Sequence, residues 1–344
     1  WHFVYRRISF FQSELFLRRH DGSLHKVDVP PDAEPSVHRE WLLVSLRTPW
    51  AVGQTTFPAG ALLAARFVDF MAGKRDLTLL YEPTSATSLS SYDWTRNFLV
   101  LNVLDDVKNR LWVLAPRHGD WKREAFPGAA EFATVHLWGV DERESDDYWM
   151  TVTDFLTPTS LYLGAIGEPP EKLKQMPAYF DASGLEISQH FVKSDDGTRV
   201  PYFQVSPGGL ALDASHPTLL TGYGGFEISE VPYYSGGVGR AWLSGGGVFV
   251  VANIRGGGEY GPAWHQAALE AKRHKAYEDF AAVARDLVAR KVTSPRLLGI
   301  EGGSNGGLLV GNMLTSYPEL FGAIVCQVPL LDMKRYSKLL AGAA

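Results

Sequence analysis

The chain has 344 residues, of which 45% are hydrophobic, so it is long enough for two domains with buried cores. Its formal net charge is -5 at pH 7, and this lack of a basic surplus argues against nucleic acid or an anionic membrane as a partner. No apolar run approaches the roughly 20 residues that cross a bilayer, and no signal-peptide pattern opens the chain.

Both ends of the chain resemble cuts within a longer sequence. Trp1 stands in strand-like sequence without an initiator Met, and residues 339–344 stop without a terminating signal. We expect a cytoplasmic protein, and a periplasmic or secreted location stays open because the true N-terminus is not present. The single cysteine, Cys326, excludes an intrachain disulfide framework. It falls in the apolar run 323–328, where we expect a buried, inert thiol.

The first half of the chain alternates short strand-like runs with turn formers. The expected strands include residues 14–19, 41–47, 62–70, 76–82, 98–104, 110–115 and 148–155. About a dozen such strands, at roughly 40 to 50 residues per four-stranded blade, predict a partial β-propeller of about three to four blades. A complete β-sandwich is the alternative, because no blade signature such as a WD dipeptide is present.

A change of composition marks the expected domain boundary. Residues 167–177 contain two adjacent prolines and four charged residues, which is linker composition. We therefore expect a partial β-propeller domain over residues 1–168, a linker over 169–184, and a partial α/β-hydrolase domain over 185–344.

The second half has a different pattern. An Asp-Gly turn at 194–198 predicts a hairpin between two strands. Runs typical of buried strands follow at residues 218–220, 248–254, 297–300 and 323–328. Between the second and third of these, apolar residues from 277 to 288 recur at helical spacing. Strands that alternate with helices predict a mostly parallel sheet with helices on both faces.

Residues 302–307, G-G-S-N-G-G, are the motif with the clearest chemistry. They lie between a strand-like run and a run of helical length, 308–317, and they contain G-x-S-x-G. This is the nucleophile elbow, a strained strand-to-helix turn that exposes a serine hydroxyl above an α/β sheet. Ser304 is therefore the candidate nucleophile of a hydrolase.

A second glycine motif suggests a different function. Residues 256–261 fit G-x-G-x-x-G after a strand, as in a dinucleotide site. That fingerprint also needs an acidic residue at the end of the next strand. The candidates Glu278 and Asp279 fall in the expected helix instead, so we favour a glycine-rich loop that approaches the active-site region. For Arg255, just before this loop, we favour a structural ion pair over a substrate contact.

Four stretches together resemble the prolyl oligopeptidase family of serine peptidases, over about residues 185 to 340. They are T-G-Y-G-G-F at 221–226, A-N-I-R-G-G-G-E-Y-G at 252–261, T-S-P at 293–295 and G-G-S-N-G-G at 302–307. That family carries a seven-bladed propeller before its α/β-hydrolase domain, so the strand-rich first half is similar in kind.

The resemblance implies a role for each of four residues. Ser304 would attack the peptide carbonyl, and the backbone N–H of Asn305 and the hydroxyl of Tyr223 would form the oxyanion hole. Phe226 would line the pocket for the residue before the cut bond, and the Asn305 side chain would also contact substrate. The residues alone leave an alternative open for two of them. Tyr223 could be a buried aromatic whose hydroxyl is satisfied locally, and Phe226 could pack in the core.

The chain lacks the rest of a catalytic triad. In α/β-hydrolases the acid and then the histidine follow the serine, but no histidine follows Ser304, and Asp332 comes too early. His265 and His274 fall in helix-like sequence, where we expect solvated or capping roles. We therefore expect the acid and the histidine beyond Ala344, and little or no activity from this chain alone.

These patterns together predict a serine peptidase that hydrolyses short peptides after proline, with the propeller as a filter. The alternatives are an oligopeptidase of the same family that prefers a basic residue or an acylated amino acid, an esterase on the same fold, and a non-catalytic binding protein. We expect a monomer with peptide as its partner, without nucleic acid or membrane. We expect no cofactor and no metal, since no ligand spacing such as H-E-x-x-H is present.

Overall fold

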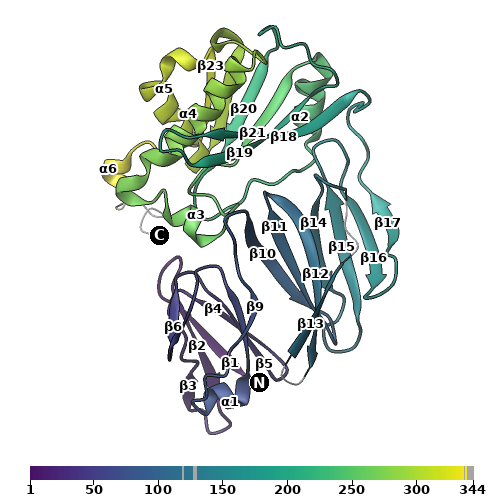
Figure 1. The fold of residues 1–344 in the computed structure, drawn as a ribbon, viewed down its shortest axis with the longest axis vertical. Helices are drawn as coiled ribbons and strands as arrows, with labels where there is room; N and C mark the ends of the chain where they lie inside the picture. Colours follow the sequence, from purple (N-terminus) through teal and green to yellow (C-terminus); the bar gives the residue numbers. More distant parts are fainter. Residues whose placement is uncertain (118–119, 127–129, 337, 339–344) are drawn as a thin grey trace. The chain divides into compact units, whose positions relative to one another are not determined.

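A computed structural model of the chain describes residues 1–117, 120–126, 130–336 and 338. The chain divides into two compact units (Figure 1). The first unit takes residues 1–89 and 261–263 together with the described residues from 334 onward, and the second takes 90–260 and 264–333. The domain boundaries expected near residues 168 and 184 lie inside the second unit, and they stay a prediction.

The first unit is built from small antiparallel sheets. Its strands are β1 (Phe3–Arg7), β2 (Ser13–Arg18) and β3 (Leu24–Lys26) in one sheet, β4 (Glu34–His38), β5 (Trp41–Ser45), β8 (Leu62–Arg66) and β9 (Thr78–Tyr81) in a second, and the hairpin of β6 (Trp50–Val52) and β7 (Thr55–Phe57). Val44 of β5 pairs with Leu63 of β8, and both are fully buried in the core of this unit. Burial of such aliphatic side chains drives the sheets together.

One predicted strand of this unit is wrong at its end. Residues 62–70 were expected to be a single strand, but β8 ends at Arg66 and the short helix α1 (Phe67–Met71) follows. Phe67 and Phe70, three positions apart, are both buried in the same core. A helical turn places residues at this spacing on one face, whereas a strand would direct them to opposite faces.

Two four-stranded antiparallel sheets open the second unit. Their strands are β10 (Thr87–Trp94), β11 (Leu99–Asp105), β12 (Lys108–Arg117) and β13 (Asp120–Ala125), then β14 (Thr134–Gly139), β15 (Asp147–Thr153), β16 (Ser160–Ala165) and β17 (Glu171–Gln175). Each sheet takes its strands in chain order. Leu111 of the first sheet and Val135 and Tyr148 of the second share one apolar cluster, so the two sheets pack face to face.

A six-stranded sheet forms the rest of the second unit (Figure 1). Its strands, in spatial order, are β18 (Leu185–Lys193), β19 (Arg199–Pro207), β21 (Val248–Ala252), β20 (Thr218–Gly222), β22 (Leu298–Gly303) and β23 (Ala323–Gln327). The last four strands are parallel, and β18 and β19 are the predicted hairpin, closed by Gly197 at φ 84°. A mostly parallel sheet is therefore confirmed.

Helices cover both faces of this sheet, as its buried strands require. Over the described residues, the α-helices are α1, α2 (Gly236–Ala241), α3 (Pro262–Gln266), α4 (His274–Ala289), α5 (Asn305–Ser316) and α6 (Met333–Tyr336), and the 3-10 helices are η1 (Leu243–Gly245), η2 (Glu270–Lys272), η3 (Pro295–Leu297) and η4 (Pro318–Leu320). Val250 of β21 packs in the cluster that holds α4 and α5, whereas Val251 packs in the cluster that holds η1. Alternate residues of one strand thus serve the two faces.

Cys326 differs from its prediction. Its thiol is exposed, although it lies in an apolar strand as expected. Within the described residues, β23 pairs with β22 alone, and its other side carries no strand. The Cys326 thiol lies 3.3 Å from the carbonyl oxygen of Gly307. Within the described part of the chain, no helix has the length and apolar character needed to cross a bilayer.

The strand order creates one switch point at the carboxyl ends of the parallel strands. β20 lies between β21 and β22, so the connections that leave β20 and β21 run to opposite sides. In open α/β sheets, ligands bind in the crevice at such a point. The segments that begin there are those after β20, β21 and β22, and they contain all four predicted site residues.

Candidate functional site

Ser304 occupies a strained turn between β22 and α5. Its backbone has φ 56° and ψ −115°, a conformation that costs a non-glycine residue free energy, and its side chain is exposed. The Ser304 backbone N–H donates to the carbonyl oxygen of Gln327 at 3.0 Å. The predicted strand–turn–helix context of the elbow is therefore confirmed.

The glycines of the elbow are required by close packing. A Cβ at Gly302 would lie 2.2 Å from the carbonyl oxygen of Gly306, within the elbow itself. A Cβ at Gly307 would lie 2.7 Å from the carbonyl oxygen of Gln327 on β23. Only glycine fits at both positions, so the glycine pattern of the motif follows from how tightly α5 packs on the sheet.

Tyr223 begins the loop that follows β20, the strand beside β22. Its side chain is half-buried, and it lies near the elbow, because a Cβ at Gly306 would be 3.7 Å from the Tyr223 ring. Two neighbouring strands therefore bring together the predicted nucleophile and the predicted hydroxyl donor. Sequence alone could not show that β20 and β22 are adjacent, since β21 lies between them in the chain.

The Asn305 side chain is used within the protein. It is 5% exposed, its Nδ2 donates to the Tyr223 carbonyl oxygen at 2.7 Å, and its Oδ1 accepts from Arg273 at 3.1 Å. As the first residue of α5, Asn305 has a backbone N–H without a partner inside the helix. An N–H at this position of a helix can bind an anion, whereas a substrate contact of the side chain stays a prediction.

The loop from Tyr223 to Glu227 contains two unusual backbone conformations. Phe226 has φ 54° and Glu227 has φ 59°, both in the left-handed region that non-glycine residues seldom adopt. Phe226 is half-buried. Consecutive left-handed residues reverse the chain sharply, and such strain persists only where the surroundings fix it.

The surroundings of this loop are supplied by the glycine-rich segment after β21. A Cβ at Gly256 would lie 2.2 Å from the Gly224 carbonyl oxygen, and one at Gly258 would lie 2.2 Å from the Glu227 carbonyl oxygen. The G-x-G-x-x-G match therefore reflects contact between two loops of the protein. This agrees with the favoured interpretation of a glycine-rich loop beside the site.

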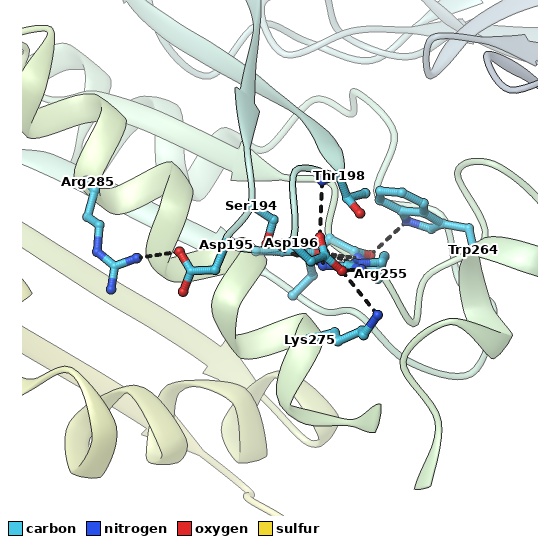
Figure 2. Close-up of polar contacts among 10 residues, drawn as sticks. Ser194, Asp195, Asp196, Thr198, Arg255, Trp264, Lys275 and Arg285 are labelled. Carbon is cyan, nitrogen blue, oxygen red and sulfur yellow. Dashed lines mark hydrogen bonds and ion pairs between the residues drawn. The ribbon is translucent and has the colours of Figure 1, made fainter. Parts of the chain in front are cut away.

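Arg255 fixes the start of that glycine-rich segment (Figure 2). It is 3% exposed, and its guanidinium bonds the buried Asp279 of α4 at 2.6 Å and Asp196 of the β18–β19 hairpin at 2.6 Å. The Arg255 hydrogen bonds hold the pKa of Asp196 far below its ordinary range. Lys275 adds a second cation on Asp196 at 3.1 Å. The predicted structural ion pair is confirmed, with Asp279 on the helix as expected.

Two buried residues near the loop differ from the sequence analysis, which gave the first no role and the second a different one. Glu259 is 1% exposed, and its carboxylate accepts from the Glu230 backbone N–H at 2.9 Å and from the Asn253 side chain at 3.4 Å. Burial raises the pKa of Glu259 to about 8. The pKa of the Glu230 carboxyl is also raised by burial. The only sequence signal was a polar residue directly after a run of glycines that follows a buried strand.

His265 is the second of these residues. It was expected to be solvated or to cap a helix, but it is 2% exposed. Its Nδ1 lies 2.6 Å from the Gly256 carbonyl oxygen and 3.1 Å from the Glu227 nitrogen. Because one ring nitrogen cannot both donate and accept, the short contact identifies Nδ1–H as a donor to Gly256, and the Glu227 N–H also reaches that carbonyl, at 3.3 Å.

The other residues considered for a triad lie elsewhere. His274 is exposed at the start of α4, with Nδ1 3.1 Å from the Ala271 carbonyl oxygen, which fits the solvated one of its two expected roles. Asp332 is exposed in the segment between β23 and α6. Over the residues that the structure describes, no group of three or more His, Cys, Asp or Glu side chains has the arrangement of a metal site.

Comparisons with known proteins show which family this chain resembles. The model of the prolyl oligopeptidase family matches residues 237–340. An uncharacterized peptidase of Sinorhizobium fredii is 39% identical over 351 residues, which cover 99% of this chain and 48% of that protein. A prolyl endopeptidase of Elizabethkingia miricola is 36% identical over 203 residues, or 59% of this chain and 29% of that protein.

The fold is shared with solved structures. A post-proline cleaving enzyme from Rickettsia typhi superposes with a TM-score of 0.90 at 33% identity, over 97% of this chain and 49% of that one. The chain spans about half the length, or less, of the curated relatives named above.

Proposed function

This chain belongs to the prolyl oligopeptidase family, and from this premise we propose that it carries the nucleophile, Ser304, of a serine peptidase. The proposed reaction is hydrolysis of short peptides on the C-terminal side of proline. The observation that carries the proposal is that Ser304 is exposed on a turn with positive φ. This turn follows β22, and the neighbouring strand β20 leads into the Tyr223 loop.

In the proposed reaction, the Ser304 Oγ attacks the peptide carbonyl carbon while a general base takes its proton. The oxygen that becomes negative accepts hydrogen bonds from the Asn305 backbone N–H and the Tyr223 hydroxyl. The C–N bond then breaks, the amine leaves with the proton, and an acyl-enzyme on Ser304 remains. Water attacks this ester, and the serine is regenerated with release of the acid product.

The base and its acid partner are proposed to come from sequence outside residues 1–344. No histidine follows Ser304 in the chain, and the full-length relatives are about twice as long. This chain on its own is then expected to react slowly or not at all.

The preference for proline rests on the relatives and on two residues. The named relatives include a prolyl endopeptidase and a post-proline cleaving enzyme. Asn305, directly after the nucleophile, resembles the prolyl-specific members of the family, and Phe226 is proposed to line the proline pocket. We further propose that the antiparallel sheets are blades of a β-propeller, about three to four in this chain, that filters substrates by size.

The test is an assay of the full-length protein that carries this sequence, with matched chromogenic peptides that end in Pro, Arg or Ala. We expect the Pro peptide to be cleaved fastest, and Ser304→Ala to lower kcat by roughly 10⁶-fold. Fast cleavage after Arg alone would point to a basic-residue oligopeptidase. Turnover of short acyl esters without peptides would indicate an esterase. A Ser304 that a fluorophosphonate does not label would exclude a serine hydrolase.

A further inference from the structure

Arg273 connects the two parts of the site that the proposed reaction needs. It is the residue directly before α4, and its guanidinium contacts both the Tyr223 loop and the residue after the nucleophile. We propose that Arg273 is a positioning residue of the oxyanion hole: it fixes Tyr223 and Asn305 relative to each other. The inference rests on the proposed function, because it assigns a role within that reaction.

The contacts of Arg273 are specific. One guanidinium nitrogen, Nη1, donates to the Gly224 carbonyl oxygen, and the other, Nη2, donates to the Asn305 Oδ1 at 3.1 Å. The guanidinium also lies 5.5 Å from the centre of the Tyr277 ring, one turn along α4, in a cation–π contact. A planar fork can bond two acceptors at once, which a lysine ammonium on a flexible stem does less well.

A closed ring of hydrogen bonds results. Asn305 Nδ2 donates to the Tyr223 carbonyl, Asn305 Oδ1 accepts from Arg273, and Arg273 donates to the next carbonyl, that of Gly224. The carbonyls of Tyr223 and Gly224, which are consecutive in the Tyr223 loop, are therefore held by Asn305 of α5 and by Arg273 directly before α4. The Tyr223 hydroxyl lies at the far end of its side chain, so a small rotation of this backbone displaces the hydroxyl by more than it moves the carbonyls.

The neighbouring glycines are consistent with a site built around this ring. A Cβ at Gly225 would lie 2.4 Å from the Asn305 Nδ2, and a Cβ at Gly256 would lie 2.9 Å from the Arg273 Nη1. Both glycines therefore leave space for the two side chains that close the ring. Gly224 and Asn305 are buried, so loss of Arg273 would leave two buried acceptors to find other donors.

The experiment replaces Arg273 in the full-length protein and separates kcat from KM with a proline-ended chromogenic peptide. We expect Arg273→Met to lower kcat by about 10- to 100-fold with KM within twofold, since a misplaced catalytic donor costs rate. Arg273→Lys keeps the charge but not the fork, and it should retain an intermediate rate. Arg285→Met is the matched control, because it removes an arginine of α4 that is bound to the exposed Asp195.

A double-variant cycle with Tyr223→Phe distinguishes positioning from general support of the fold. If Arg273 acts through Tyr223, then Arg273→Met should cost less than about threefold in kcat once the hydroxyl is absent. A cost that is equal in both backgrounds would overturn the inference. The inference would also be overturned if Arg273→Met had the same kcat as the unsubstituted protein, or if it changed KM alone.

Two further measurements keep the outcome decisive. If Arg273→Met does not fold, the kcat of Arg273→Lys decides, with its thermal midpoint as the check on folding, and a natural kcat there contradicts the inference. A failure of the proposed function itself would be seen in the unsubstituted protein and not in the variants. In that case the natural protein itself neither cleaves the proline peptide nor reacts with a fluorophosphonate at Ser304.

Discussion

Tyr223 and Asn305 divide the work of the site between side chain and backbone. Asn305 uses its amide to hold the Tyr223 carbonyl at 2.7 Å, which leaves its backbone N–H for the proposed oxyanion. Tyr223 uses its backbone to hold position, which leaves its hydroxyl for the same oxygen. A substitution at either residue therefore has one effect through chemistry and another through structure, and variants must be chosen to separate them.

Tyr223→Phe is the variant that isolates the chemical part at this scale. It removes only the hydroxyl and keeps the ring beside Gly306. We expect kcat for the proline peptide to fall by about 10²- to 10³-fold, with KM little changed, because one oxyanion donor is lost. Steady-state kinetics on the full-length protein measure this. Tyr317→Phe, at the far end of α5, is the control, and an unchanged kcat in Tyr223→Phe would remove Tyr223 from the oxyanion hole.

The elements that matter most are three loops at one edge of the parallel sheet. The loop after β20 carries Tyr223, the loop after β21 carries the glycines that hold it, and the turn after β22 carries Ser304. The glycine-rich loop after β21 is held in place by the buried side chains of Arg255, Glu259 and His265, whose hydrogen bonds are made to residues other than Ser304. Loop support of this kind predicts effects on stability that are separable from effects on chemistry.

Glu259 provides a prediction of pH dependence. Its pKa is raised to about 8 in the folded protein, whereas an unperturbed glutamate has a pKa of about 4.5. Between these pH values the unfolded chain binds fewer protons at this residue than the folded chain, so stability falls as pH rises from about 4.5 to about 8. Glu259→Gln cannot ionise and should remove this contribution.

The measurement for Glu259→Gln is the thermal unfolding midpoint across that pH range. The midpoint of the variant, relative to the natural protein, should increase from pH 5 to about pH 8, while Glu230 contributes to both curves. Glu131→Gln, which alters an exposed carboxylate paired with Lys108, should track the natural protein. A constant difference for Glu259→Gln would show that Glu259 is ionised throughout the range.

Over the whole molecule, apolar and polar contacts join the antiparallel sheets of the second unit to its six-stranded sheet. The clearest is the β11–β12 turn, where Asp106 and Val107 have φ 47° and 65°. The Asp106 carboxylate accepts from Arg199 at 2.9 Å and from the Tyr260 hydroxyl at 2.8 Å. Val107 is 1% exposed in the same cluster as Phe203 of β19.

Asp106→Asn tests this connection. Asparagine tolerates the left-handed backbone, so the change removes the charge with little backbone strain. Arg199 is half-exposed, so we expect a modest loss of about 1 kcal/mol in the free energy of unfolding. Denaturant unfolding measures it. Asp105→Asn, one residue earlier and 3.9 Å from Arg110, should lose less, and equal losses in the two variants would contradict the assignment.

Much of the fold and the centre of the site could be predicted from local sequence. The Asp-Gly hairpin, the buried parallel strands and the elbow at Ser304 each depend on residues close together in the chain. These features have local physical causes: the backbone conformations that glycine allows, and the spacing of hydrophobic residues over a few positions.

What could not be predicted depends on distant partners. The helical turn at Phe67 and Phe70 is set by the core into which both rings pack. The burial of His265 depends on a carbonyl of another loop. Arg273 gave no sequence signal, because its acceptors are 49 and 32 positions away in the chain.

The contact between the glycine-rich segment and the Tyr223 loop has a consequence for how this sequence can evolve. Gly256 faces the Gly224 carbonyl and Gly258 faces the Glu227 carbonyl, each at a separation that leaves no space for a side chain. A side chain cannot be added at 256 or 258 by a single substitution, because a Cβ at either position forces the opposite loop to move. Because both opposing atoms are backbone carbonyl oxygens, no side-chain change at 224 or 227 makes room, so glycine should be retained at 256 and 258 among descendants of this gene.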